Sequence, residues 1–241
     1  MRPEGIGRTI LPALLGGHRI SSIFLEPVSL GNFAVIIGAW GLSKRSNDLV
    51  NMLFFVFAAM TMIALSDSRY GLITLAFLVL MRCIPFSKKN IWMIALPLLI
   101  VGMLLSIALF FDGRYSDSVI GRLFVSGKML LSLDLGMIFG GVGFDIYFGD
   151  MGYPSLLTRL GVVLCLFLWI AFWLVNMEDE RGDRFRASIT LYMSLILSVS
   201  GTSLFALKTA GVLWFLVGCL AARQKMTLPA TSGCAAAFSR T

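Results

Sequence analysis

Arginine side chains occur in several of the polar segments that separate the apolar stretches of this chain. Arg69 lies in the short turn SDSRYGL, Arg19 in GGHRISSIFLEPVSLGNF, and Arg122 and Arg159 in or just after a long segment at about 112–155. A guanidinium group binds phosphate oxygens through a planar set of donors, keeps its charge, and loses less hydration than an ammonium group. The pattern therefore predicts a site for an anion, either a lipid-linked diphosphate or the head group of a membrane lipid.

Composition indicates the solvent in which these residues lie. The 241 residues are 58% hydrophobic and 14% charged, which is too apolar for a water-soluble globule. We therefore expect an all-α integral membrane protein that crosses the membrane several times. The apolar segments predicted to cross it as seven helices are 28–42, 49–65, 71–84, 91–111, 156–175, 187–207 and 211–222.

The short basic loops predict the orientation of these helices. Lys and Arg occur in the loops at 43–48, 87–90, 180–186 and 222–225, which fall on one side when seven helices alternate in direction. That side is predicted to be cytoplasmic, with 177–186 as a solvated loop. The opposite side then receives residues 1–27, the turn around Arg69, the segment 112–155 and a tight turn at Lys208.

The segment 112–155 is longer than a connection requires, and long loops of this kind are usually functional. Within it, residues 119–133 have the pattern of an amphipathic helix lying on the membrane surface. Gly140, Gly141 and Gly143 are expected to let the backbone turn or approach a glycan. We expect residues 1–225 to form one membrane domain and residues 226–241 to form a disordered tail.

Three stretches occur in the order seen in one bacterial family: HRISSIFLEPVSLGNF, DSRYGL, and GR followed by GGVGFDIYFGDMGYPSLLTRLG. Over about residues 17–175 the chain resembles the O-antigen polymerase and ligase family, particularly its exopolysaccharide-polymerase branch. The resemblance implies a GT-C-like helical glycosyltransferase of the inner membrane, active at the periplasmic face on undecaprenyl-diphosphate-linked oligosaccharides. It implies no nucleotide sugar, no metal and no cofactor.

Carried onto this chain, the resemblance assigns the diphosphate to Arg19, Arg69 and Arg122. The reaction breaks the bond between an anomeric carbon and a phosphate, so positive charge near the departing diphosphate lowers the barrier. Arg159 is included among the substrate-binding residues because it follows the long segment near the outer end of its helix.

An acceptor hydroxyl group needs a base, or an oriented hydrogen-bond acceptor, within reach of its proton. Asp150 and Glu26 are the candidates, and Asp150 lies in the matched segment just before a helix. Tyr153 is expected to stack on a sugar or to form a hydrogen bond with it.

The chain differs from the family in two ways. Ligase members carry an important histidine in or near the long loop, whereas the sole histidine here is His18, and this difference favours a polymerase over a ligase. Family members are also longer, and this chain begins almost at the first matching motif. Its length therefore indicates a C-terminal portion of such a protein, as from a truncated or split gene.

Other functions are open at this point. A transporter or flippase for an anionic lipid-linked saccharide would use the same arginines, although charges near the middle of the spans and repeated halves, which typify transporters, are not evident. An O-antigen ligase is a further alternative. The expected partners are the lipid bilayer, the lipid-linked substrate, and a chain-length regulator and flippase of the same pathway, with no nucleic acid.

Overall fold

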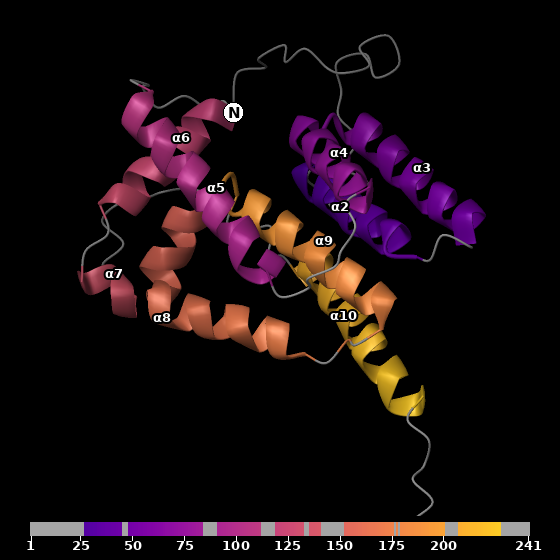
Figure 1. The fold of residues 1–241 in the computed structure, drawn as a ribbon. Helices are drawn as coiled ribbons and strands as arrows, with labels where there is room; N and C mark the ends of the chain where they lie inside the picture. Colours follow the sequence, from indigo (N-terminus) through magenta and orange to yellow (C-terminus); the bar gives the residue numbers. More distant parts are fainter. Residues whose placement is uncertain are drawn as a thin grey trace, which may run out of the picture.

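The computed structural model describes residues 27–44, 48–83, 91–111, 119–132, 135–140, 152–175, 177, 179–200 and 207–227. Every regular element in these ranges is helical (Figure 1), which confirms the predicted all-α class for the described residues. The elements are α2 (Pro27–Leu42), α3 (Leu49–Ser66), α4 (Arg69–Cys83), α5 (Ile91–Phe110), α6 (Val119–Leu131), α7 (Leu135–Phe139), α8 (Gly152–Leu174), α9 (Glu180–Ile196) and α10 (Leu207–Thr227).

Two of the described helical segments are long and apolar enough to cross a membrane, as judged by their length and composition. They are Leu49–Ser66, which is α3, and Leu156–Leu174, which is most of α8. Three shorter apolar segments, Val28–Leu42, Ile94–Phe110 and Leu207–Ala222, lie within α2, α5 and α10. Each of these helices falls on a segment that was predicted from the apolar pattern.

The start of α9 differs from the prediction. Residues 180–186, predicted as a solvated loop, form the first turns of this helix instead. The Asp179 carboxylate accepts a hydrogen bond from the Gly182 amide at 2.8 Å, and Glu180 and Asp183 lie in the first turn. A capping side chain and acidic residues stabilise a helix N-terminus, so the charged run is a helix-start signal.

The end of α9 also differs from the prediction. The helix ends at Ile196 and a turn follows at 197–199, whereas the apolar pattern predicted a span to 207. The predicted turn at Lys208 is wrong as well, because α10 begins at Leu207 and Lys208 lies in its first turn.

Helix α9 lies at the centre of the bundle and packs against α2, α4 and α5. Its Phe185 and Tyr192 side chains are fully buried. The Phe185 ring meets the Trp40 ring of α2 edge to face, with 5.5 Å between centroids. Helix α2 in turn packs against α3, α4 and α10, so α3, α4, α5 and α10 meet at α2 and α9.

Helix α6 confirms the helix predicted within 119–133, and it packs along α5. The contact is close because Gly127 faces the backbone of α5: a Cβ atom at this position would lie 2.2 Å from the Leu104 carbonyl oxygen. The next helix, α7, is short and packs against α8.

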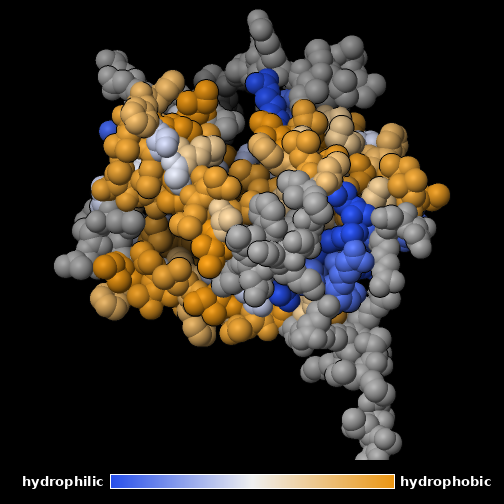
Figure 2. Space-filling model, in the orientation of Figure 1, coloured by the Kyte–Doolittle hydropathy of each residue, from blue (hydrophilic) through white to orange (hydrophobic). Residues whose placement is uncertain are grey.

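The face of the molecule drawn in Figure 2 is largely apolar where its residues are coloured. Val50 and Phe57 of α3 are 81% and 74% exposed, and many apolar side chains of α5, α8 and α10 are also exposed. Exposed apolar surface of this extent is typical of proteins that contact a lipid phase or another protein.

Candidate functional site

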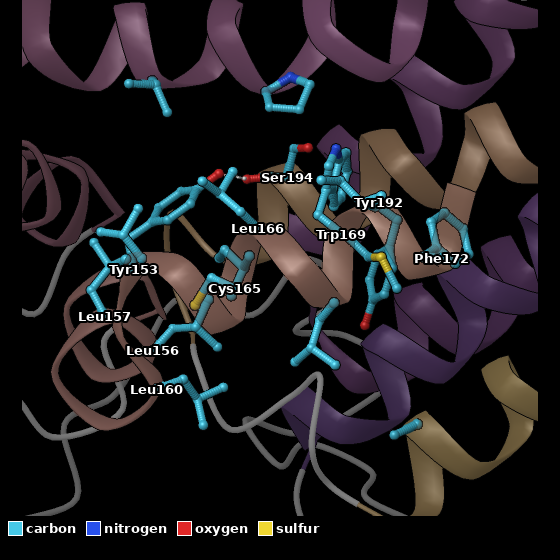
Figure 3. Close-up of a pocket in the computed structure, with 18 of the residues that line it drawn as sticks. Tyr153, Leu156, Leu157, Leu160, Cys165, Leu166, Trp169, Phe172, Tyr192 and Ser194 are labelled. Atoms are coloured by element: carbon cyan, nitrogen blue, oxygen red, sulfur yellow. Dashed lines mark hydrogen bonds between the residues drawn. The ribbon is translucent and has the colours of Figure 1, made fainter. Parts of the chain in front are cut away.

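An apolar cavity of about 570 Å³ lies among α5, α8, α9 and α10, with further contributions from α2 and α6. Figure 3 shows its lining, in which Leu156, Leu157, Leu166, Trp169 and Phe172 of α8 are labelled. Apolar pockets with a small number of placed polar groups are typical ligand sites. The aliphatic and aromatic lining of this one suits a hydrocarbon chain.

A kink in α8 shapes the cavity, and it is visible in Figure 1 as a sharp change in the direction of the helix. Gly161 has φ 72° and ψ 166°, outside the helical region, and lining residues lie on both sides of it. Gly140, which follows α7 and has φ 80°, meets it closely: a Cβ atom on Gly161 would lie 2.4 Å from the Gly140 nitrogen. Glycine is required at both positions, because a side chain would clash and would strain the positive φ.

The start of α8 docks on the end of α9 at one end of the cavity. The Tyr153 hydroxyl group donates a hydrogen bond to the Ser194 carbonyl oxygen at 3.2 Å, and the Tyr153 amide donates to the Leu197 carbonyl oxygen at 2.7 Å. Gly152 allows this approach, since a Cβ atom there would lie 1.8 Å from the same Leu197 oxygen. Tyr153, Ser194 and Leu197 all line the cavity.

Helix α6 reaches the same end of α9. Arg122 donates to the Val199 carbonyl oxygen at 3.4 Å, and the buried Ser126 hydroxyl group donates to the Ser198 carbonyl oxygen at 3.1 Å. Carbonyl groups at a helix C-terminus carry partial negative charge and attract cations. Arg122 and Tyr153, both predicted to bind substrate, are thus attached to the same short segment, residues 194–199.

The remaining predicted site residues lie elsewhere or outside the described residues. Arg69 is exposed as the first residue of α4, and Arg159 is exposed on α8 two residues before the kink. Neither side chain lines the cavity. The predictions for Arg19, Glu26 and Asp150 fall outside the described residues.

The turn before Arg69 has an unusual backbone. Asp67 has φ 51° and is 3% exposed, and in the described ranges it is the sole residue other than glycine with a positive φ. Ser68 caps α4 by accepting a hydrogen bond from the Gly71 amide at 3.1 Å. Gly31 of α2 packs against this turn, because a Cβ atom there would lie 2.4 Å from the Ser68 hydroxyl oxygen. Arg69 therefore directly follows a turn that packs against α2.

A charged cluster occupies the region where α2 and α4 end and where α3 and α9 begin. Lys44 forms an ion pair with Asp48 at 3.3 Å, and Arg82 donates to the Lys44 carbonyl oxygen at 3.4 Å. The pKa of Asp48 is lowered, first by a hydrogen bond from Asn51 and then by the charges of Lys44 and Arg181. Lys44 and Asp48 of the predicted basic segment 43–48 therefore lie near Arg181 of the segment 180–186.

Sequence reasoning proposed Arg122 and Tyr153 as site residues, and it did not predict the cavity or the kink at Gly161. The kink has a local signal in the sequence, because an isolated glycine such as Gly161 within an apolar helical pattern weakens the prediction of a straight helix. The cavity has no such signal, because its walls come from helices far apart in the sequence.

No protein-family model, curated protein or solved structure matches this chain.

Proposed function

We propose that this protein acts on a lipid-linked anionic glycan as a membrane polysaccharide polymerase. The observation that carries the proposal is the junction of Arg122 and Tyr153 with residues 194–199 at one end of an apolar cavity. A lipid-linked diphosphate has the matching form, with a hydrocarbon chain that suits the cavity and an anionic group that suits a guanidinium group.

In the proposed reaction the growing glycan moves from its undecaprenyl diphosphate to the next lipid-linked repeat unit. A hydroxyl oxygen of the acceptor attacks the anomeric carbon of the donor sugar, and the bond between that carbon and the phosphate oxygen breaks. The diphosphate leaves with the bonding electrons, and Arg122, Arg69 and Arg19 stabilise its added negative charge.

The proton of the acceptor hydroxyl group passes to a carboxylate, with Asp150 and Glu26 as the candidate bases. Tyr153 positions the sugar beside residues 194–199. The proposed setting is the inner membrane of a bacterium, with a GT-C-like bundle of seven spans and the reacting groups at the periplasmic face. The basic segments at 43–48 and 180–186 then lie in the cytoplasm.

The first test measures polysaccharide chain length in a deletion strain that is complemented with this chain. We expect the unaltered chain to restore long polymer. We expect Arg122→Ala to leave single lipid-linked repeats and to lower polymer formation by roughly 100-fold, the effect typical of losing one donor that stabilises a developing charge. Arg122→Lys should restore part of the activity, because it keeps the charge without the planar donors.

Arg184→Gln is the matched control, since Arg184 lies in the charged cluster near the start of α9 and pairs with Glu180. It should leave the polymer unchanged at an equal amount of protein in the membrane. Equal polymer length with Arg122→Ala and with the unaltered chain would contradict the proposed role of Arg122. Movement of single repeats across the membrane without any lengthening would favour the flippase alternative.

A further inference from the structure

The corner where α8 ends and α9 begins holds an arginine against a tryptophan. The Arg186 guanidinium group lies 5.3 Å from the centre of the Trp173 ring and donates a hydrogen bond to the Val175 carbonyl oxygen. Val175 directly follows the last residue of α8, so Arg186 places a positive charge at the C-terminal end of that helix. These contacts hold the guanidinium group in place at the surface of the bundle.

Two nitrogen atoms at this corner have no acceptor among the described residues. Arg186 Nε and Trp173 Nε1 are both buried and form no hydrogen bond with that part of the chain. Within the described part of the chain, Arg186 forms no ion pair within 4 Å. Burial lowers the pKa of Arg186, and the nearby charge of Asp183 opposes this effect. Buried donors normally have partners, so this pair is suited to an acceptor from outside the chain.

The acceptor that fits best is an anionic oxygen. A guanidinium group and an indole N–H group are both donors without acceptor capacity, and guanidinium groups bind phosphate strongly. The Arg186 side chain is partly exposed, so a phosphate can approach its guanidinium group from the surface of the bundle. Arginine stacked on tryptophan also suits a membrane interface, where amphipathic aromatic rings are enriched.

An apolar path along α8 leads to this corner. Phe167, Ile170 and Leu174 share one face of the helix and are 65%, 47% and 77% exposed. Leu174 is the last residue of α8 and directly precedes Val175, whose carbonyl oxygen accepts from Arg186, so hydrocarbon lying on this face would end at the turn that Arg186 contacts. The path identifies the source of the phosphate as a lipid, because a free anion would gain nothing from the apolar face.

The start of α9 gathers side chains of both charges, with Asp48, Glu180 and Asp183 beside the basic ones. Lys44, Arg82 and Arg181 lie near the start of α9, and Figure 2 shows hydrophilic residues gathered over that part of the molecule. Arg181 forms a second pair of the same kind, with its guanidinium group 4.1 Å from the centre of the Trp40 ring. Basic pockets between membrane helices are typical binding places for anionic head groups.

We infer that the Arg186–Trp173 corner binds the phosphate of an anionic phospholipid whose acyl chains lie on the exposed face of α8. The site is separate from the junction of Arg122 and Tyr153 with residues 194–199, and it does not depend on the proposed catalysis. Its expected effect is to stabilise the bundle where α8 and α9 meet.

The test measures thermal unfolding of the purified full chain in detergent with added phosphatidylglycerol, phosphatidylcholine or inorganic phosphate. We expect phosphatidylglycerol to raise the midpoint temperature more than phosphatidylcholine does, and inorganic phosphate to have no effect. Arg186→Gln should weaken the apparent affinity for phosphatidylglycerol by roughly tenfold, because it removes charge-assisted hydrogen bonds. Trp173→Phe should weaken the affinity less, because this variant loses only the indole N–H group and keeps an aromatic ring beside Arg186.

The matched control is Lys128→Gln, which alters an exposed lysine on α6 that lies 5.5 Å from the centre of the Phe124 ring and should leave the lipid response unchanged. Equal stabilisation of Arg186→Gln and the unaltered chain would overturn the inference. So would equal stabilisation by phosphatidylcholine, or by inorganic phosphate, which would indicate an anion site without a lipid. The comparison of the three additives on the unaltered chain decides the lipid source even if Arg186→Gln does not fold.

Discussion

Helices α8 and α9 are opposites in composition and in burial. Helix α8 is strongly apolar, yet only 17% of the residues in its span Leu156–Leu174 are buried. Helix α9 begins with the charged run ERGDRFR and contains several hydroxyl residues, yet nearly all of its residues from 187 to 196 are buried. In a water-soluble protein the more apolar helix would be the central one. The inversion favours a lipid phase around α8, because hydrocarbon solvates its apolar side chains as well as a core would.

The buried hydroxyl groups of Thr190 on α9 and Ser198 just beyond it are satisfied locally, whereas the buried Tyr192 hydroxyl group has no hydrogen-bond partner among the described residues. Thr190 donates to the Arg186 carbonyl oxygen at 2.8 Å, one turn earlier in the same helix. Beyond the helix end, Ser198 donates to the Leu195 carbonyl oxygen at 2.6 Å. Hydrogen bonds of this kind allow small polar residues to lie inside an apolar bundle without an unpaired donor.

The largest expected effect is the loss of a buried ring from α9, compared with the loss of an exposed ring from α8. Phe185→Ala on α9 should lower the free energy of unfolding by about 3–5 kcal/mol, because the buried ring leaves a cavity beside Trp40. Phe167→Ala on α8 should change it by less than about 0.5 kcal/mol, because this ring is 65% exposed. Thermal or denaturant unfolding in detergent measures both, and equal losses would contradict the inverted burial.

An intermediate effect is expected where the two helices touch. Gly152→Ala should cost about 1–3 kcal/mol, because the added methyl group meets the Leu197 carbonyl oxygen and forces the start of α8 away from α9. The control is Gly211→Ala on α10, which has no neighbour within 4 Å and should gain about 0.5–1 kcal/mol from helix propensity. Hydrogen exchange of the Tyr153 amide should accelerate in Gly152→Ala alone.

The smallest expected effect concerns one hydrogen bond at the end of α9. Ser126→Ala should lower stability by about 1 kcal/mol, because the Ser198 carbonyl oxygen loses a buried donor from another helix. Ser106→Ala should change stability by less than about 0.5 kcal/mol, since Ser106 is exposed and bonds to Gly102 within its own helix. Unfolding midpoints compare the two, and a larger loss for Ser106→Ala would contradict the role of the α6 contact.

Sequence reasoning placed most helices well and their ends less well. The apolar run 49–65 matches α3 almost residue for residue, because its length and the turn at Asp67 leave little choice. In α9 the same reasoning failed at both ends. The charged run 180–186 was interpreted as part of a solvated loop, whereas Asp179 in fact caps a helix that begins there. At the other end, the apolar pattern was extended past the turn at 197–199.

Sequence reasoning also proposed only some of the residues that make up the candidate site. Arg122 and Tyr153 were chosen by residue type and motif, and both contact the end of α9. Nothing in the local pattern indicated that they would meet the same six residues, because the partners are 77 and 41 positions away in the sequence. Pairing across such distances depends on how whole helices pack.

By itself, the sequence determined that the chain forms apolar helices and where most of them lie, because helix formation depends on local length, apolar content and caps. Tertiary structure alone decided which helix is central, how Gly140 and Gly161 meet to bend α8, and where the cavity opens. Those features depend on the close approach of backbone segments that are distant in the sequence. At such contacts the presence or absence of a single side chain decides the geometry.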